Sequence, residues 1–321
     1  SLGCDGICFS PIYPSPGADC GYDISNYRDI APEFGGMEAF KKVLEGAHAR
    51  DMKVVMDLVV NHTSDEHEWF QKSRRRIDPY TDYYIWRPGK PGGKLPNNWD
   101  SFFEGKAWTF DEVRGEYYLH LFAVKQPDLN MDNPRVRAEV KKILRFWLDM
   151  GVDGFREDVI TYISKPKGLP DAPFYMPMAR GIFQYNNGPH LHEYLNEFRT
   201  VLDDYDCVTI GEAPLITTKR ALDFIGGGQY PEVVFLALCC VNAVDGTIDL
   251  PIQIDSQFIN IEGSQGYADY VKYIDAEGVF PWTAEELAQF VTRVNPDATF
   301  QDLYDTWKGY SMESVIARKE G

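Results

Sequence analysis

The chain has 321 residues, of which 44% are hydrophobic, and a formal net charge of −17 at pH 7. This length allows one large α/β domain or two smaller ones. Acidic and basic residues are interspersed, and the excess of acid argues against nucleic acid and an anionic membrane surface as partners. No stretch is long and apolar enough to span a bilayer, so no membrane association is expected.

The six cysteines form no CxxC or Cys/His metal pattern, and a chain of this length does not need disulfides. We interpret them as reduced thiols in a cytoplasmic protein, and we expect no secretory signal. The residues present imply no metal and no organic cofactor. The sequence does not indicate the oligomeric state.

Short apolar runs and helical periodicity alternate along the chain. The runs predict strands at 4–10, 53–60, 151–158, 207–213 and 232–238, and apolar residues recur at helical spacing over 37–47, 134–148 and 191–202. The second of these helices has Asn133 as its predicted N-cap, Pro134 in its first turn and Gly151 after its end. Strands that alternate with amphipathic helices indicate βα units and a parallel sheet.

Residues 62 to about 126 interrupt this alternation, because they are dense in aromatic residues, Gly and Pro. A bare loop of this length is uncommon. We therefore expect an inserted subdomain between a strand and the helix that follows it.

Three predicted strands end in carboxylates, which are Asp57, Asp158 and Glu212. Side chains alternate between the two faces of a strand, so Arg156 and Asp158 share one face and Glu157 takes the other. Any one of these acids alone is best interpreted as the cap of a loop or of the next helix. Three together, with an arginine beside one of them, favour a site, in which Arg156 holds Asp158 ionised as a competent nucleophile.

Four ordered motifs in this chain resemble the signature regions of the α-amylase family, glycoside hydrolase family 13. They are "DLVVNH" (57–62), "QPDLN" (126–130), "GFREDVI" (154–160) and "IGEAP" (210–214). Within the family they most resemble the oligo-1,6-glucosidase and α-glucosidase branch, as do "SPIYPSPGADCGYDISNYRDI" (10–30) and "NNWDSFFEGKAW" (97–108). The resemblance runs from residue 1 to roughly 235.

The resemblance implies an α/β fold, a partial (β/α)8 TIM barrel with strands similar to the second to sixth. Its inserted subdomain follows the second of these strands. The expected parts are a first part of the barrel (1–61), the inserted subdomain (62–126), a second part of the barrel (127–238) and an unassigned divergent tail (239–321).

The same resemblance implies a retaining α-glucosidase that hydrolyses terminal α-1,6 bonds, and possibly α-1,4 bonds, of short oligosaccharides such as isomaltose, maltose or sucrose-like sugars. Asp158 matches the catalytic nucleophile, and Glu212 matches the general acid/base. Residues expected to bind the sugar are Asp19, Tyr22, Asp57, His62, Phe122, Arg156 and Val159. The histidines at 67, 120, 190 and 192 are interpreted as structural.

Val159 directly follows the proposed nucleophile. Branch members that cleave isomaltose tend to carry Val there, whereas those that cleave maltose tend to carry Thr. This residue therefore favours α-1,6 over α-1,4 links. The "RLDRD"-type loop of the branch's sucrose isomerases is not present, which makes isomerisation the less favoured activity.

The chain departs from the family at both ends. It has no histidine after His192 and so lacks the family's Asn-His-Asp signature, and the first strand of the family would lie before residue 1. We expect a chain that is incomplete at both ends, since five strands cannot close an eight-stranded barrel. The alternative is a truncated or non-catalytic amylase-like protein with a binding or scaffold role. Residues 283–294 predict a helix, and Asp245 and Asp255 are interpreted as ordinary loop acids.

Overall fold

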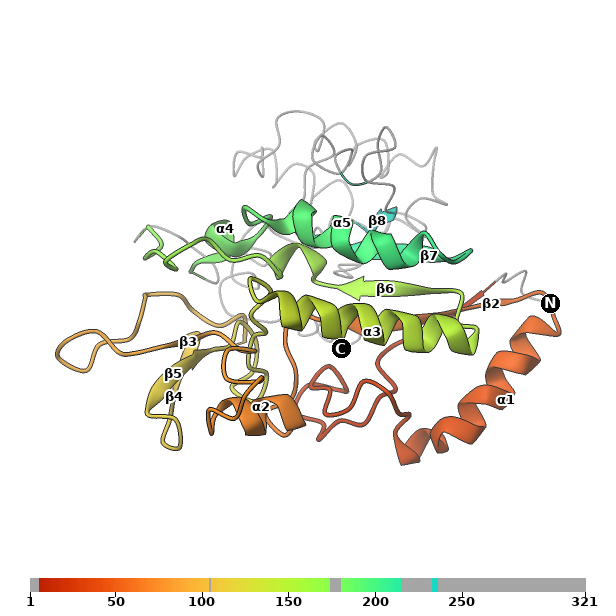
Figure 1. Cartoon of the computed structure of the whole chain (residues 1–321), viewed down its shortest axis with the longest axis horizontal. Helices are drawn as coiled ribbons and strands as arrows, with labels where there is room; N and C mark the ends of the chain where they lie inside the picture. The colour runs from red at the N-terminus through yellow and green to blue at the C-terminus, as the bar shows by residue number, and fades with distance from the viewer. Residues whose placement is uncertain (1–5, 104, 174–179, 215–223, 225–232, 236–321) are drawn as a thin grey trace, which may run out of the picture. The chain divides into compact units, whose positions relative to one another are not determined.

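The computed structural model describes residues 6–103, 105–173, 180–214, 224 and 233–235 (Figure 1). The chain divides into two compact units, Ser1–Gly211 and Glu212–Gly321, and each is described by itself. The predicted helix at 283–294 and the acids Asp245 and Asp255 lie outside the described residues.

The first unit is built on a parallel sheet, and the segments between its strands supply the helices. Its strands are β1 (Gly6–Phe9), β2 (Lys53–Val59), β6 (Gly154–Asp158) and β7 (Val208–Glu212), the last of which ends one residue beyond the unit. They are ordered β1-β2-β6-β7, and every neighbouring pair is parallel. The predicted parallel sheet is therefore confirmed, and the described strands form an open sheet rather than a closed barrel.

Helices follow the strands where the periodicity predicts them. They are α1 (Gly36–His48), α3 (Pro134–Met150) and α5 (Leu191–Leu202), with shorter turns at η1 (Pro32–Phe34), η2 (Ile160–Tyr162) and α4 (Ile182–Tyr185). Helix α3 packs against α5. In the second unit the described strand is β8 (Val233–Phe235), within the run predicted at 232–238.

Helix α3 shows how local sequence sets an element. The side chain of Asn133 accepts a hydrogen bond of 3.0 Å from the backbone N–H of Arg135, Pro134 opens the helix, and Gly151 closes it in the left-handed conformation at φ 103°. The predicted cap, first turn and end are all confirmed. The buried face of the helix carries Trp147, which is fully buried and donates from its ring nitrogen to the carbonyl of Tyr27 at 2.8 Å.

The segment predicted as an insertion has secondary structure of its own. It holds α2 (Glu68–Ser73) and an antiparallel sheet of β3 (Trp86–Arg87), β4 (Trp108–Asp111) and β5 (Glu116–Leu119) in the order β3-β5-β4. Its aromatic residues form a core, in which Phe70 stacks on Trp86 with ring centroids 5.4 Å apart. Burial of several large rings explains how so long a segment between two strands of the parallel sheet remains ordered.

The described residues also bear on membrane association, cysteine pairing and metal binding. Among them, no helix is long and apolar enough to cross a membrane. Cys8, Cys20 and Cys207 are free thiols. No group of three or more His, Cys, Asp or Glu side chains in the described part of the chain could hold a metal ion.

Candidate active site

The carboxyl ends of β2 and β6 bring three charged side chains together. The strands pair in parallel with Asp57 opposite Arg156 and Val59 opposite Asp158. Arg156 Nη1 donates to both oxygens of Asp57, at 3.1 and 3.0 Å, and to Oδ1 of Asp158 at 2.7 Å. The predicted shared face of Arg156 and Asp158 is thereby confirmed, since their side chains bond to each other.

All three side chains are largely removed from water, with exposed fractions of 12% for Arg156, 3% for Asp57 and 9% for Asp158. One guanidinium lies between two carboxylates, so its charge offsets the repulsion that the two acids would otherwise have in a low-dielectric site. Asp57 is further fixed by the hydroxyl of Tyr13, which donates to its backbone carbonyl at 2.7 Å. Asp57, Arg156 and Asp158 thus form a rigid charged cluster rather than a set of solvated loop acids.

The loop after β1 contacts this charged cluster. Asp23 is fully buried and accepts hydrogen bonds from Ser15 Oγ and from the backbone N–H groups of Ala18 and Asp19, which holds the loop in shape. Tyr22 then donates from its hydroxyl to Asp57 Oδ2 at 3.3 Å. The sequence motif indicates Asp19 and Tyr22, whereas the supporting role of Asp23 comes from the structure.

His62 lies near the same charged cluster and is buried, with 1% exposure. Gln126 connects it to the loop, because Gln126 Nε2 donates to Asp19 Oδ2 at 2.9 Å and lies 3.1 Å from His62 Nε2. Phe122 lies against the imidazole with ring centroids 5.1 Å apart. Burial, followed by the nearby charge of Lys165, lowers the pKa of His62 to about 3. The ring is therefore neutral at physiological pH.

Phe122 belongs to an aromatic stack. Phe102 lies parallel to it at a centroid distance of 5.1 Å, and Tyr162 stacks on Phe102 at 5.4 Å. Flat apolar rings beside hydrogen-bonding groups are a surface that suits a sugar, which has apolar C–H faces and polar edges.

Val159 has an unusual backbone. It follows Asp158 directly, has φ 37° and ψ 40°, and is buried to 7% exposure. A β-branched residue in the left-handed region is a true outlier, and such strain of about 1–3 kcal/mol is concentrated at functional sites. The strained turn directs the chain into η2 immediately after the proposed nucleophile.

Glu212 is the last residue of β7 and is half-buried. β7 pairs in parallel with β6, with Ile210 opposite Arg156 and Gly211 opposite Glu157. Glu212 itself belongs to the second unit, so its distance from Asp158 stays a prediction.

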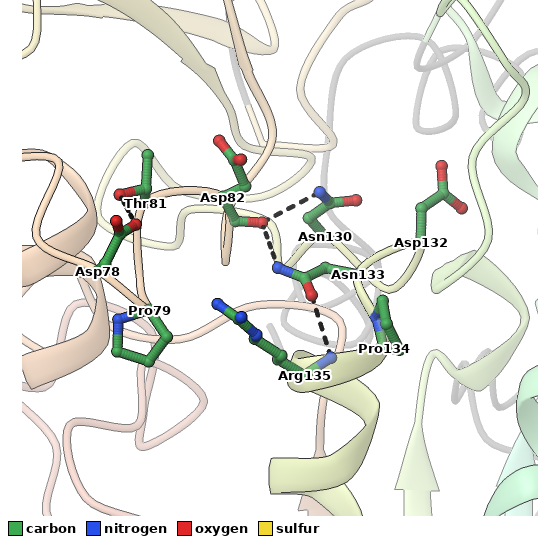
Figure 2. A pocket seen from close by; sticks show the side chains of 9 residues that line it. All are labelled: Asp78, Pro79, Thr81, Asp82, Asn130, Asp132, Asn133, Pro134 and Arg135. Carbon is green, nitrogen blue, oxygen red and sulfur yellow. Dashed lines mark hydrogen bonds between the residues drawn. The ribbon is translucent and has the colours of Figure 1, made fainter.

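A cavity of about 380 Å³ contains none of the predicted site residues (Figure 2). Asp78, Asp82 and Asp132 line it, together with the start of α3. Its polar groups bond to one another: the side-chain amides of Asn130 and Asn133 both donate to the carbonyl of Asp82 at 3.1 Å (Figure 2). These bonds hold the first turn of α3 and give the cavity a structural explanation.

Four polar residues around His62 were not singled out by the sequence, namely Asn61, Gln126, Asp128 and Lys165: Asn61 Nδ2 and Gln126 Nε2 face its two ring nitrogens, and Lys165 pairs with Asp128. Three of them lie within the quoted motifs "DLVVNH" and "QPDLN", so the motifs contained a signal for them. Lys165 has no such signal, because its partners are 37 and 104 positions away in the chain.

Comparison with known proteins identifies the family. The model of the α-amylase catalytic domain matches residues 1–234. An oligo-1,6-glucosidase from Parageobacillus thermoglucosidasius is 58% identical over 225 residues, which cover 69% of this chain and 40% of that protein.

Solved structures agree with this match. The crystal structure of Bacillus licheniformis trehalose-6-phosphate hydrolase is 45% identical with a TM-score of 0.68, covering 72% of this chain and 41% of that one. An isomaltulose synthase mutant from Erwinia rhapontici, in complex with its natural substrate sucrose, is also 45% identical, with a TM-score of 0.65 and coverage of 70% and 40%. The chain spans about 40% of the length of these relatives. Because the catalytic-domain model matches well over half of the 321 residues, the chain belongs to the α-amylase family of glycoside hydrolases.

Proposed function

We propose that the chain carries the nucleophile and the sugar-binding residues of a retaining α-glucosidase that acts on terminal α-1,6 bonds of short oligosaccharides. The observation that carries the proposal is the bond of Arg156 to both Asp57 and Asp158, beside the Asp19–Gln126–His62 network. A carboxylate that is buried, ionic and held by a fixed cation is prepared to attack an electrophilic carbon.

In the first step the carboxylate of Asp158 attacks the anomeric carbon of the terminal glucose. The bond from that carbon to the glycosidic oxygen breaks, and the leaving oxygen takes a proton from Glu212. The product is a glycosyl ester on Asp158, reached through an oxocarbenium-like transition state. This assignment requires the two carboxyl groups to lie about 5–5.5 Å apart.

In the second step Glu212, now ionised, removes a proton from a water molecule that attacks the same carbon. The ester bond breaks, glucose leaves with its original anomeric configuration, and Asp158 is again a carboxylate. Arg156 stabilises the ionised form of Asp158 before the attack and after the release.

The remaining predicted residues bind the sugar. Asp19 and Asp57 accept hydrogen bonds from glucose hydroxyls, Tyr22 and Phe122 supply ring surface, and His62 adds a hydrogen-bonding edge. Buried polar groups of this kind discriminate strongly, because a ligand that lacks the matching hydroxyl leaves them without partners.

The substrate class is supported by what the similar proteins are named for, namely oligo-1,6-glucosidase, trehalose-6-phosphate hydrolase and an isomaltulose synthase with bound sucrose. Val159 next to the nucleophile favours isomaltose over maltose within that class.

The test is glucose release from isomaltose and from maltose by the purified chain, with Asp158→Asn as the control. Release that disappears in the control supports the proposal. If the folded chain releases no glucose from either sugar, the non-catalytic binding protein becomes the better description. Calorimetric titration with isomaltose then decides whether the site still binds sugar.

A further inference from the structure

Lys165 is a buried cation close to the candidate site. Its side chain is 5% exposed, and Nζ lies 2.7 Å from Asp128 Oδ2 and donates to Asn61 Oδ1 at 2.7 Å. Asp128 is fully buried and also accepts from the backbone N–H of Leu121 at 2.9 Å. Burial lowers the pKa of Lys165 and raises that of Asp128, while each charge opposes the shift of the other. At 2.7 Å, with a further N–H on Asp128, the pair is ionic at neutral pH.

This cation fixes the orientation of the Asn61 amide. An ammonium group has only donors, so the amide atom that faces Lys165 must be the oxygen. The nitrogen Nδ2 therefore lies 3.2 Å from His62 Nδ1, and it also donates to Asp128 Oδ2 at 3.3 Å. Rotation of the amide by half a turn would place an N–H against the ammonium of Lys165.

The amide of Gln126 is fixed in the same manner on the other side of the imidazole. Its Oε1 accepts from the backbone N–H of Ala123 at 2.9 Å, and its Nε2 donates to Asp19 Oδ2 at 2.9 Å. The same Nε2 lies 3.1 Å from His62 Nε2. Both ring nitrogens of His62 therefore face amide N–H donors.

This geometry disfavours a protonated ring. An imidazolium has two N–H donors and no acceptor, so neither amide N–H would find an acceptor on the ring. A neutral ring keeps one nitrogen as an acceptor, and its single N–H has the carbonyl of Tyr22 as a partner. Burial and the charge of Lys165 lower the pKa of His62, and that carbonyl raises it.

The other charged groups around the ring do not reverse this result. Asp19 accepts a hydrogen bond from Gln126, Asp128 is paired with Lys165, and Asp57 is held by Arg156. The hydroxyl of Tyr27 donates to the backbone carbonyl of His62 at 2.9 Å, not to the ring.

We propose that Lys165 is a positioning residue that fixes Asn61 as a donor to His62 and so keeps the His62 ring a neutral hydrogen-bonding partner for the sugar. The inference rests on the proposed function, because it assigns His62 to the sugar site. The proposed role requires no contact between Lys165 and the substrate. It acts through Asn61 by geometry and through space by its charge.

The test is nuclear magnetic resonance of the histidine rings in the full chain as the pH is lowered from 8 to 4. The His62 signal is assigned by its loss in His62→Gln. In the wild type the ring stays neutral over this whole range. In Lys165→Met the Asn61 oxygen loses the ammonium that orients it and the nearby positive charge is removed, so the His62 titration midpoint moves above about pH 5.

Lys165→Met leaves the carboxylate of Asp128 buried without its cation, and that variant can fail to fold. The double variant Lys165→Met with Asp128→Asn removes both charges and keeps similar volumes, so it serves as the second test with the same expected midpoint. Lys90→Met with Asp171→Asn removes an exposed ion pair and should leave the His62 ring neutral throughout.

The inference is overturned if the wild-type ring titrates between pH 8 and pH 4, or if it stays neutral to pH 4 in the double variant. Neither result depends on turnover. Failure of the proposed function would appear separately, as glucose release that Asp158→Asn does not reduce.

Discussion

Arg156 and Asp158 lie two residues apart on β6, and Nη1 of the arginine donates to Oδ1 of the aspartate at 2.7 Å. The same nitrogen bonds to both oxygens of Asp57 on the neighbouring strand. One buried cation thus serves two buried carboxylates. Removal of the cation would leave two negative charges together with little water to solvate them.

We expect Arg156→Met to destabilise the fold by about 3–5 kcal/mol near pH 7, because an uncompensated buried charge costs that much. The loss should become smaller as the pH falls. In this variant the folded-state pKa values of the two acids lie above their unfolded values, so protonation in acid relieves the repulsion. Urea unfolding at several pH values measures both effects.

Arg145→Met is the matched control, since Arg145 forms an exposed pair with Asp204 and is 46% exposed. Its unfolding midpoint should stay close to that of the wild type. Equal losses in the two variants, or a loss in Arg156→Met that does not change with pH, would contradict the explanation.

The meeting of these three charges could be predicted because strand geometry is local. Alternation along β6 places Arg156 and Asp158 on one face, and parallel pairing places the ends of β2 and β6 at one edge of the sheet. The caps of α3 were predictable for the same reason, since Asn133, Pro134 and Gly151 each act on the backbone next to them.

The support of His62 could not be predicted in this way. Lys165 and Asn61 are separated by 104 positions, and Gln126 and Asp19 by 107. No periodicity relates such residues, because they meet only through the path of loops around the sheet. The left-handed backbone of Val159 was also unpredictable, since a valine in isolation strongly disfavours it.

Gly154 has a steric role that the sequence did not indicate. A Cβ atom added there would lie 2.0 Å from the backbone oxygen of Val208 on β7. Gly154→Ala should therefore separate β6 from β7 and destabilise the fold by about 3 kcal/mol or more. Thermal or urea unfolding measures the change.

Gly46 provides the opposite control. It lies inside α1, where an added Cβ would meet its nearest neighbour, Arg50 Nη1, at an ordinary 3.7 Å. Gly46→Ala should stabilise the protein by about 0.5–1 kcal/mol, because alanine loses less conformational entropy in a helix. If the two alanine variants have effects of the same sign, the steric argument is wrong.

Asp153, at the opposite end of β6 from Asp158, makes the stability of the fold depend on pH. It accepts hydrogen bonds from Lys53 Nζ at 2.9 Å and from the backbone N–H of Val54 at 2.9 Å, and it lies 2.7 Å from His48 Nε2. Burial raises the pKa of Asp153, but these partners outweigh burial and hold the pKa below its ordinary value.

A depressed folded-state pKa means that the stabilisation is present above the unfolded pKa, about 3.9, and is lost as the pH falls through the folded value. Asp153→Asn should therefore lower the urea midpoint at neutral pH, and the difference from the wild type should shrink in acid. Asp171→Asn, at an exposed ion pair, should show little difference at any pH. A difference for Asp153→Asn that is constant with pH would exclude this explanation.

Val159 provides the test of linkage specificity. Its side chain is buried directly after Asp158, and a left-handed backbone fixes its direction. Val159→Thr keeps the shape and replaces a methyl group with a hydroxyl, so it tests polarity at constant volume. We expect the ratio of isomaltose to maltose hydrolysis to fall by about tenfold, since one well-placed hydrogen bond is worth about 1–1.5 kcal/mol. Val159→Ala separates the loss of the methyl group from the gain of the hydroxyl, because it removes bulk and adds no polar atom. If the ratio of kcat/KM values is unchanged in Val159→Thr, this position does not set the linkage preference.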